Sequence, residues 1–217
     1  PNYMTVALPD TGDGQFSAGA TQKLVELANH STSVGIGPGM SRSEAINKLV
    51  ADAYEKIRVP AVFDADALNA LAQLDGGLPK ARGPRVLTPH VGEFRRLVRD
   101  DTLSPAECRA CAPEFACRHG VIVVLKGHRS LVTDGQTTHE NDTGNPGMAT
   151  GGSGDVLTGV ISSLLSQDLS PLDAAILGVH VHGLAGDIAC SKFGEVSLDA
   201  ENVKDCLSEA FMKLADD

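Results

Sequence analysis

The residues best suited to chemistry lie in a glycine-rich stretch from Gly144 to Asp155, which leads directly into a predicted helix. Its glycines and its proline exclude a strand or a helix interior. Apolar residues then recur at helical spacing, at Val156, Val160, Ile161, Leu164 and Leu165. The first turn of such a helix has unpaired backbone N–H groups and a positive dipole end, which suit an anion. Asp155 adds a carboxylate that is a poor phosphate ligand but a good base, so the pattern indicates phosphoryl transfer to a hydroxyl group.

Other polar and glycine residues follow predicted strands elsewhere in the chain. They are Gly37-Pro38-Gly39, Asp64, Asp66, Thr88-Pro89-His90 and Lys126-Gly127. In parallel sheets, ligands bind at the carboxyl ends of the strands. We therefore expect these segments to meet the glycine-rich loop at one site.

Strands alternate with helices along the chain, which predicts an α/β fold with a central, mainly parallel sheet and helices on both faces, in three layers. The predicted strands span 4–8, 32–39, 60–63, 85–88, 121–125, 131–133 and 137–139, with a polar turn over 9–14. The predicted helices span 17–29, 41–57, 91–98, 104–120, 155–167, 171–191 and 199–215, and a further helix starts within 64–69.

Local signals define some element ends. Ser41 and Ser104 each stand three residues before a glutamate, which is the spacing of a capping box, and Pro105 suits the first helical position. Asp134-Gly135 predicts a hairpin turn, so the last two strands are expected to be an antiparallel addition to the sheet.

Composition limits the possible partners. The 217 residues, 42% of them hydrophobic, suit a single domain over 1–217 with a sizeable core. The net charge of −10 argues against nucleic acid and anionic membranes as partners, but not against a nucleotide in a locally positive pocket. We find no apolar run of membrane-spanning length and no signal peptide.

The five cysteines are odd in number and fall in predicted helices, which favours a reduced, cytoplasmic setting. Cys108, Cys111, Cys117 and His119 raise the alternative of a zinc site. Because only one Cys-x-x-Cys is present and its segment is predicted to be a helix, we favour small packed thiols.

Three ordered motifs carry a resemblance to a known family: 88–94 (TPHVGEF), 124–127 (VLKG) and the run from Gly144 to Gly159. They resemble the ADP/ATP-dependent NAD(P)H-hydrate dehydratases of the ribokinase-like superfamily, over nearly the whole chain. Members usually have proline where Val91 stands. They also usually begin with a further strand-and-helix segment with its own glycines, and we expect this chain to lack that part of the sheet and of the substrate pocket.

The resemblance implies a repair reaction on a small molecule, hydrated NADH or NADPH. ADP or ATP, with Mg²⁺, would phosphorylate the hydroxyl on the nicotinamide ring, and the ring nitrogen would then expel phosphate, restoring NAD(P)H with release of AMP or ADP. The family commonly forms homo-oligomers, and a tetramer is implied.

The resemblance also implies residue roles. Asp155 would be the catalytic base and contact the substrate together with Gly39 and His90. The N–H groups of Gly152, Ser153 and Gly154 would form the anion hole. Lys126, Gly127, His128, Arg129, Ser130 and Gly154 would bind the nucleotide. Glu93 would help hold Mg²⁺ through water.

Each role has a plainer alternative. Asp155 could merely favour the helix dipole, and Glu93 could be a solvated first-turn glutamate. His90 could be a satisfied strand-end histidine, Lys126 a surface lysine and Gly39 a simple turn residue. Asp64 and Asp66 could orient Mg²⁺ or ribose, or cap the next helix. Asn145 could orient the loop, whereas His180 and His182 are interpreted as packing residues.

Two other functions remain open at this level. One is a ribokinase-like kinase of a vitamin precursor, of the hydroxyethylthiazole or hydroxymethylpyrimidine kinase type. The other is a truncated, inactive nucleotide-binding module. The sequence leaves open ADP against ATP, and NADH hydrate against NADPH hydrate.

Overall fold

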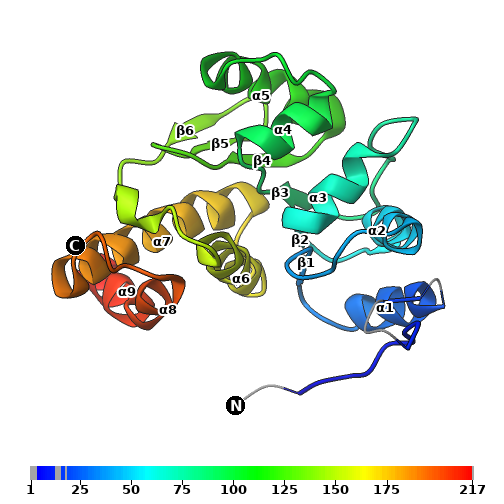
Figure 1. The fold of residues 1–217 in the computed structure, drawn as a ribbon, viewed down its shortest axis with the longest axis horizontal. Helices are drawn as coiled ribbons and strands as arrows, with labels where there is room; N and C mark the ends of the chain where they lie inside the picture. The colour runs from blue at the N-terminus through cyan, green and yellow to red at the C-terminus, as the bar shows by residue number, and fades with distance from the viewer. Residues whose placement is uncertain (1–3, 13–15, 18, 217) are drawn as a thin grey trace.

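A six-stranded sheet forms the centre of the fold in the computed structural model, which describes residues 4–12, 16, 17 and 19–216 (Figure 1). Its strands lie in sequence order: β1 (Val34–Ile36), β2 (Ala61–Phe63), β3 (Arg85–Leu87), β4 (Ile122–Leu125), β5 (Leu131–Thr133) and β6 (Thr138–Glu140). The first four are parallel, whereas β5 and β6 pair antiparallel. The predicted mainly parallel sheet with an antiparallel addition is confirmed.

Helices cover both faces of the sheet (Figure 1). One face packs against α1 (Ala20–Asn29), α2 (Glu44–Lys56), α3 (Ala65–Ala72), α4 (Val91–Val98) and α5 (Pro105–His119). The other packs against α6 (Ser153–Leu165) and α7 (Pro171–Phe193), and α8 (Ala200–Asp205) and α9 (Leu207–Asp216) pack on α7. Successive strand residues point to opposite faces. Phe63 therefore joins the first core and Val62 the second, which produces the predicted three layers.

Arg85 is buried in the first core, where its guanidinium hydrogen-bonds backbone carbonyls and, among the described residues, no carboxylate. Its guanidinium donates instead to the carbonyls of Tyr54 and Ile57 at the end of α2, and to those of Val59 and Pro84. Burial lowers the pKa of Arg85 to about 10, so the group stays charged at neutral pH. It thereby satisfies the free carbonyls at the helix C-terminus.

Helix α7 corrects the expectation that no apolar run is long enough to span a membrane. Its 23 residues include a window of mean hydropathy 1.3, so its length and composition would suffice. The same window is 61% buried against the sheet, α6, α8 and α9. Its apolar character therefore reflects packing on several sides.

Locally encoded ends are reproduced closely. Helix α4 has the predicted bounds, and Ser104 caps α5 with Glu107 in a reciprocal capping box. The β5–β6 hairpin turns at Asp134, whose carboxylate accepts from the backbone N–H groups of Gln136 (2.8 Å) and Thr137 (2.6 Å). Side chain and backbone interact within a few residues in each case, so the sequence suffices to predict them.

Other ends differ from the prediction. The strand predicted over 4–8 is wrong: no strand is assigned there, and Met4 is 96% exposed. The helix predicted from residue 41 begins at Glu44, because Ser43, not Ser41, accepts from the Ile46 N–H group as its cap. Ser41 has a positive φ of 66°, outside the helical region.

Two further predicted helices have different bounds in the structure. The helix predicted over 17–29 begins at Ala20, and the last predicted helix is divided between α8 and α9 at Cys206. Of the turn predicted over 9–14, residues 13 and 14 lie outside the described residues. The Asp10 side chain closes its first part by accepting from the Gly12 N–H group at 2.9 Å.

Candidate active site

The carboxyl ends of β2, β3 and β4 bring three predicted side chains together. Lys126 Nζ lies 2.6 Å from Asp64 Oδ1, and the Thr158 hydroxyl of α6 donates to Asp64 Oδ2 at 2.9 Å. The Lys126 backbone N–H donates to the Pro89 carbonyl at 2.8 Å, which places His90 beside it. Asp64 is only 1% exposed, so its charge needs both of these donors.

Asp64 and Asp66, the two aspartates that follow β2, make different side-chain bonds. Asp64 stands at the N-cap of α3 but makes no side-chain cap bond, so the helix-cap interpretation is wrong for it. Asp66 accepts from the Ser41 backbone N–H at 2.9 Å and pairs with Arg42 at 3.5 Å. This bond holds the segment just after Gly39, in the loop that follows β1.

His90 and Glu93 form a reciprocal capping box at the start of α4. His90 Nδ1 accepts from the backbone N–H groups of Gly92 (2.9 Å) and Glu93 (3.3 Å), which places the proton of a neutral ring on Nε2. Glu93 Oε2 accepts from the His90 backbone N–H at 2.9 Å, and Oε1 lies 3.4 Å from His90 Nε2.

Glu93 is buried, so its interpretation as a solvated glutamate is wrong. Burial raises the pKa of its carboxyl, although the His90 N–H bond and the positive charge of Lys126 oppose the shift. The nearby Asp64 carboxylate adds to the increase. The positive charge of Lys126 therefore stabilises two buried carboxylates, those of Asp64 and Glu93.

The glycine-rich loop passes through a short 3-10 turn, Pro146–Met148, and enters α6 at Ser153, two residues earlier than predicted. Gly152 has a φ of +87°, which a residue with a side chain rarely adopts. A Cβ at Gly154 would lie 3.1 Å from Lys126 Nζ. The ammonium group therefore sits directly against the first turn of α6, while Asp155 in that turn is exposed.

A cavity of about 740 Å³ opens beside this turn. The residues with predicted nucleotide, anion-hole or substrate roles that line it are His90, Lys126, Gly127, His128, Arg129, Ser130, Ser153 and Gly154. Apolar side chains of Met148, Leu157 and Val179 form part of the wall. Gly39, Glu93, Gly152 and Asp155 are not among its lining residues, so of the predicted substrate contacts only His90 lines this cavity, and the predicted base does not.

His182 of α7 was predicted as a packing residue, and it is buried, but it also lines the cavity. Its Nε2 lies 3.4 Å from the Ser153 hydroxyl. Burial lowers the pKa of His182 to about 4, and the positive charge of Lys126 acts in the same direction, so the ring is neutral at pH 7. Glycines inside the helix, at 183 and 186, were the sequence signal for a close approach at this point.

Two further side chains from the sequence analysis, His180 and Asn145, make contacts of different kinds. His180 Nδ1 lies 3.8 Å from Asp142 Oδ1, whose side chain is exposed. Asn145 does orient the loop: its side-chain oxygen accepts from the Gly147 N–H at 3.1 Å, and its amide donates to Asp187 at 2.9 Å. Asp187 was not predicted.

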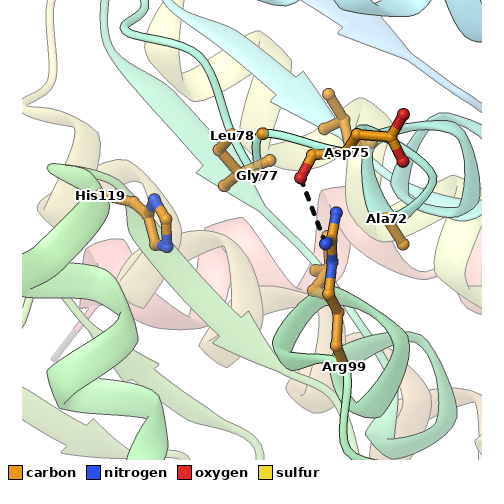
Figure 2. Close-up of a pocket in the computed structure, with 9 residues that line it drawn as sticks. Ala72, Asp75, Gly77, Leu78, Arg99 and His119 are labelled. Carbon is orange, nitrogen blue, oxygen red and sulfur yellow. Dashed lines mark hydrogen bonds between the residues drawn. The ribbon is translucent and has the colours of Figure 1, made fainter.

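A second cavity, of about 280 Å³, lies at the C-terminal ends of α3, α4 and α5 (Figure 2). There Arg99 donates to the Asp75 carbonyl at 3.3 Å, and His119 stands apart from both (Figure 2). Helices α3 and α4 start at the carboxyl ends of the strands, so their C-termini lie at the opposite edge of the sheet. None of the predicted site residues lines this cavity.

The cysteines of α5 are dispersed. Cys108 is buried, Cys111 donates to the Cys108 carbonyl at 3.5 Å, and Cys117 is exposed. His119 instead packs its ring against Phe115. Within the described part of the chain, no group of three or more His, Cys, Asp or Glu side chains could hold a metal ion.

Comparison with known proteins agrees with the family that the sequence motifs indicate. A family model described as NAD(P)H-hydrate dehydratase matches residues 3–209. The chain belongs to this family. The bifunctional NAD(P)H-hydrate repair enzyme Nnr of Moorella thermoacetica is 42% identical over 217 residues, which cover 99% of this chain and 41% of that protein. The chain thus spans about two fifths of the length of the curated relatives it matches.

Solved structures agree with the family assignment. An ADP/ATP-dependent NAD(P)H-hydrate dehydratase from Bacillus subtilis, co-crystallized with ATP/Mg²⁺, matches with a TM-score of 0.75 and 28% identity over 87% of this chain and 69% of that one. A ribokinase-like superfamily protein from Enterococcus faecalis matches with a TM-score of 0.71 and 26% identity over 90% and 68%. The ribokinase-like fold of this dehydratase family member is thereby confirmed.

Proposed function

We propose that this chain dehydrates hydrated NADH or NADPH at the expense of ADP or ATP, through a phosphorylated intermediate. The observation that carries the proposal is the Lys126–Asp64 pair at the first turn of α6, beside a cavity wide enough for a nucleotide. A positive side chain and a helix N-terminus together favour a phosphate group there. The glycine-rich loop lets that phosphate approach the backbone.

In the proposed reaction, the substrate hydroxyl oxygen attacks the terminal phosphorus of the nucleotide. The bond from that phosphorus to the bridging oxygen breaks, which releases AMP from ADP or ADP from ATP. The ring nitrogen then donates its lone pair, the carbon–oxygen bond breaks, and inorganic phosphate leaves. The iminium ion that results loses a proton from the adjacent ring carbon to solvent, which restores the ring double bond. The restored ring is NADH or NADPH, so the net change is loss of water.

Asp155 is proposed as the base that takes the hydroxyl proton. Its exposed position in the first turn of α6 is consistent with contact to a substrate that arrives from outside the cavity. The N–H groups of Gly152, Ser153 and Gly154 would stabilise the charge that develops on the transferred phosphoryl group. Gly39 and His90 are proposed to contact the hydrated nicotinamide.

The nucleotide is proposed to occupy the cavity. Lys126 would approach its phosphates, and the segment Gly127, His128, Arg129 and Ser130 would follow its ribose and base. The Ser130 hydroxyl already bonds the Gly127 carbonyl at 3.2 Å, which shapes this segment. Met148 and Val179 offer the apolar surface that an adenine ring prefers.

Mg²⁺ is proposed to arrive with the nucleotide phosphates and to neutralise part of their charge. The carboxylates fit it only through water. Both oxygens of Asp64 already accept hydrogen bonds, and one oxygen of Glu93 accepts from the His90 N–H. Because Mg²⁺ retains water ligands readily, Glu93 can assist it without giving up its cap.

A homo-oligomer, tetrameric by the resemblance, and a cytoplasmic location complete the proposal. The five free thiols support a reducing compartment. Light scattering of the purified chain measures its mass in solution and tests the tetramer.

The proposal is tested by the recovery of NADH absorbance from hydrated NADH in the presence of ADP and Mg²⁺. We expect recovery with the unaltered chain and none with the Asp155→Asn variant, while calorimetry shows similar ADP binding by both. Recovery by Asp155→Asn would contradict the role of the base. ADP binding without recovery by the unaltered chain would favour the inactive nucleotide-binding module.

A further inference from the structure

Helix α7 carries the glycine-rich loop on a face that is shaped to receive it. A Cβ at Gly183 would overlap the Thr143 hydroxyl, and a Cβ at Gly186 would overlap the Met148 sulfur. The Thr143 hydroxyl also donates to the His180 carbonyl at 2.9 Å. The loop therefore rests directly on the backbone of α7.

Asp187, one residue beyond this glycine pair, fixes the direction of the loop. Its Oδ2 accepts from the Gly144 backbone N–H at 2.8 Å, and its Oδ1 accepts from the Asn145 side-chain amide at 2.9 Å. Asn145 Oδ1 accepts from the Gly147 N–H, so the amide cannot turn over without losing that bond. Both carboxylate oxygens are therefore used, each by a specific donor.

Asp187 is not among the residues that line the cavity, but all the loop residues it holds are. Gly144 and Asn145 line it directly, and Met148 lies further along the same wall. A change at Asp187 would thus alter the cavity through the loop, and not through contact with a ligand.

We propose that Asp187 is a positioning residue of the nucleotide site, which sets the shape of the cavity wall by holding Gly144 and Asn145. This inference rests on the proposed function only for the identity of the occupant, an adenine nucleotide. The arrangement requires a carboxylate opposite an amide. With two amides, the single oxygen at position 187 can accept from only one of its two donors, and the other donor faces an NH2 group; with two carboxylates, two negative charges face each other.

The experiment exchanges the two groups. Asp187→Asn faces the Asn145 amide with a second amide, and Asn145→Asp faces the Asp187 carboxylate with a second carboxylate. The double variant restores one carboxylate and one amide in reversed positions, and the new amide can still accept from the Gly144 N–H. ADP affinity is measured by calorimetry with Mg²⁺, alongside melting temperatures and the KM values for ADP and for hydrated NADH.

We expect each single variant to weaken ADP binding about tenfold, the size of one charge-assisted hydrogen bond, and the double variant to recover to within about threefold of the unaltered chain. The KM for hydrated NADH should change less than the KM for ADP. Asp173→Asn is the matched control, because Asp173 also lies on α7 but bonds with Ser170 at the start of the helix, away from the glycine-rich loop. It should leave ADP affinity within about twofold, whatever its effect on melting.

Two results would overturn the inference. One is a Kd for ADP in Asp187→Asn equal to that of Asp173→Asn. The other is a double variant that is weaker than either single variant, with no recovery. If Asp187→Asn does not fold, Asn145→Asp and the double variant still decide between these results. Absence of ADP binding by the unaltered chain would instead refute the proposed function.

Discussion

Replacing Lys126 with methionine removes the ammonium group that faces Asp64 while keeping a side chain of similar length. The Asp64 carboxylate is 1% exposed and Lys126 is 20% exposed, so the variant leaves a buried charge that, among the described residues, keeps the Thr158 hydroxyl as its one side-chain donor. Breaking a buried ion pair on one side costs about 3–5 kcal/mol, whereas an exposed pair contributes about 0–1 kcal/mol. Because one donor remains, we expect a loss of about 3 kcal/mol in the free energy of unfolding.

Urea unfolding at pH 7 measures this loss. The double variant Asp64→Asn with Lys126→Met carries no charge at either position of this pair, so it should recover at least half of the stability. Both variants should bind ADP more weakly, because both lack the ammonium group. The double variant would therefore regain stability without regaining affinity for ADP.

The matched control is Lys192→Met. Lys192 also pairs with a carboxylate, that of Glu209, but both side chains are exposed. We expect this variant to lose about 1 kcal/mol or less. Equal losses in Lys126→Met and Lys192→Met would refute the reasoning that burial of Asp64 makes its partner essential.

Three further predictions concern the core, the β1 loop and the pH dependence. Arg85→Met should lower the free energy of unfolding by about 3 kcal/mol or more in urea, because several buried carbonyls lose their donor; a loss below about 1 kcal/mol would contradict this. Gly37→Ala should lower the melting temperature more than Gly39→Ala, because both have positive φ but only at Gly37 would a Cβ overlap the Asp64 carbonyl; equal shifts would contradict this. His182 has a pKa lowered to about 4 in the folded state, so its contribution to stability is complete above pH 6.5 and is lost as the pH falls through about 4. It amounts to about 3 kcal/mol, so stability measured from pH 7 to pH 4 should fall less in His182→Gln.

The part of the fold that was predictable from the sequence is the part encoded locally. The α5 capping box at Ser104 and the hairpin turn at Asp134 are decided by contacts within a few residues. Buried apolar runs such as Ile122–Leu125 reveal a parallel strand without any knowledge of its neighbours. Residues 4–8 share that apolar character but form no strand. A strand also needs a neighbouring strand to pair with, and the sequence pattern does not show whether one is present.

The candidate site was likewise predictable from the sequence only in part. The sequence located the segments at the strand ends, because the rule for parallel sheets assigns them to one edge. It did not reveal that the Asp64 carboxylate bonds Lys126 and Thr158 instead of capping α3, since those residues are distant along the chain. Asp187 was missed for the same reason: an isolated aspartate in an apolar helix carries no spacing signal, and its two donors lie more than 40 positions away.

The central claim is that the substrate hydroxyl is phosphorylated before it leaves. Hydrated NADH that carries ¹⁸O in its ring hydroxyl tests this directly, with ADP, Mg²⁺ and the full chain, by mass spectrometry of the inorganic phosphate released. Phosphorylation of the hydroxyl predicts that each restored NADH is accompanied by one phosphate that contains the label. Restored NADH with unlabelled phosphate, and with the label in water, would contradict the account.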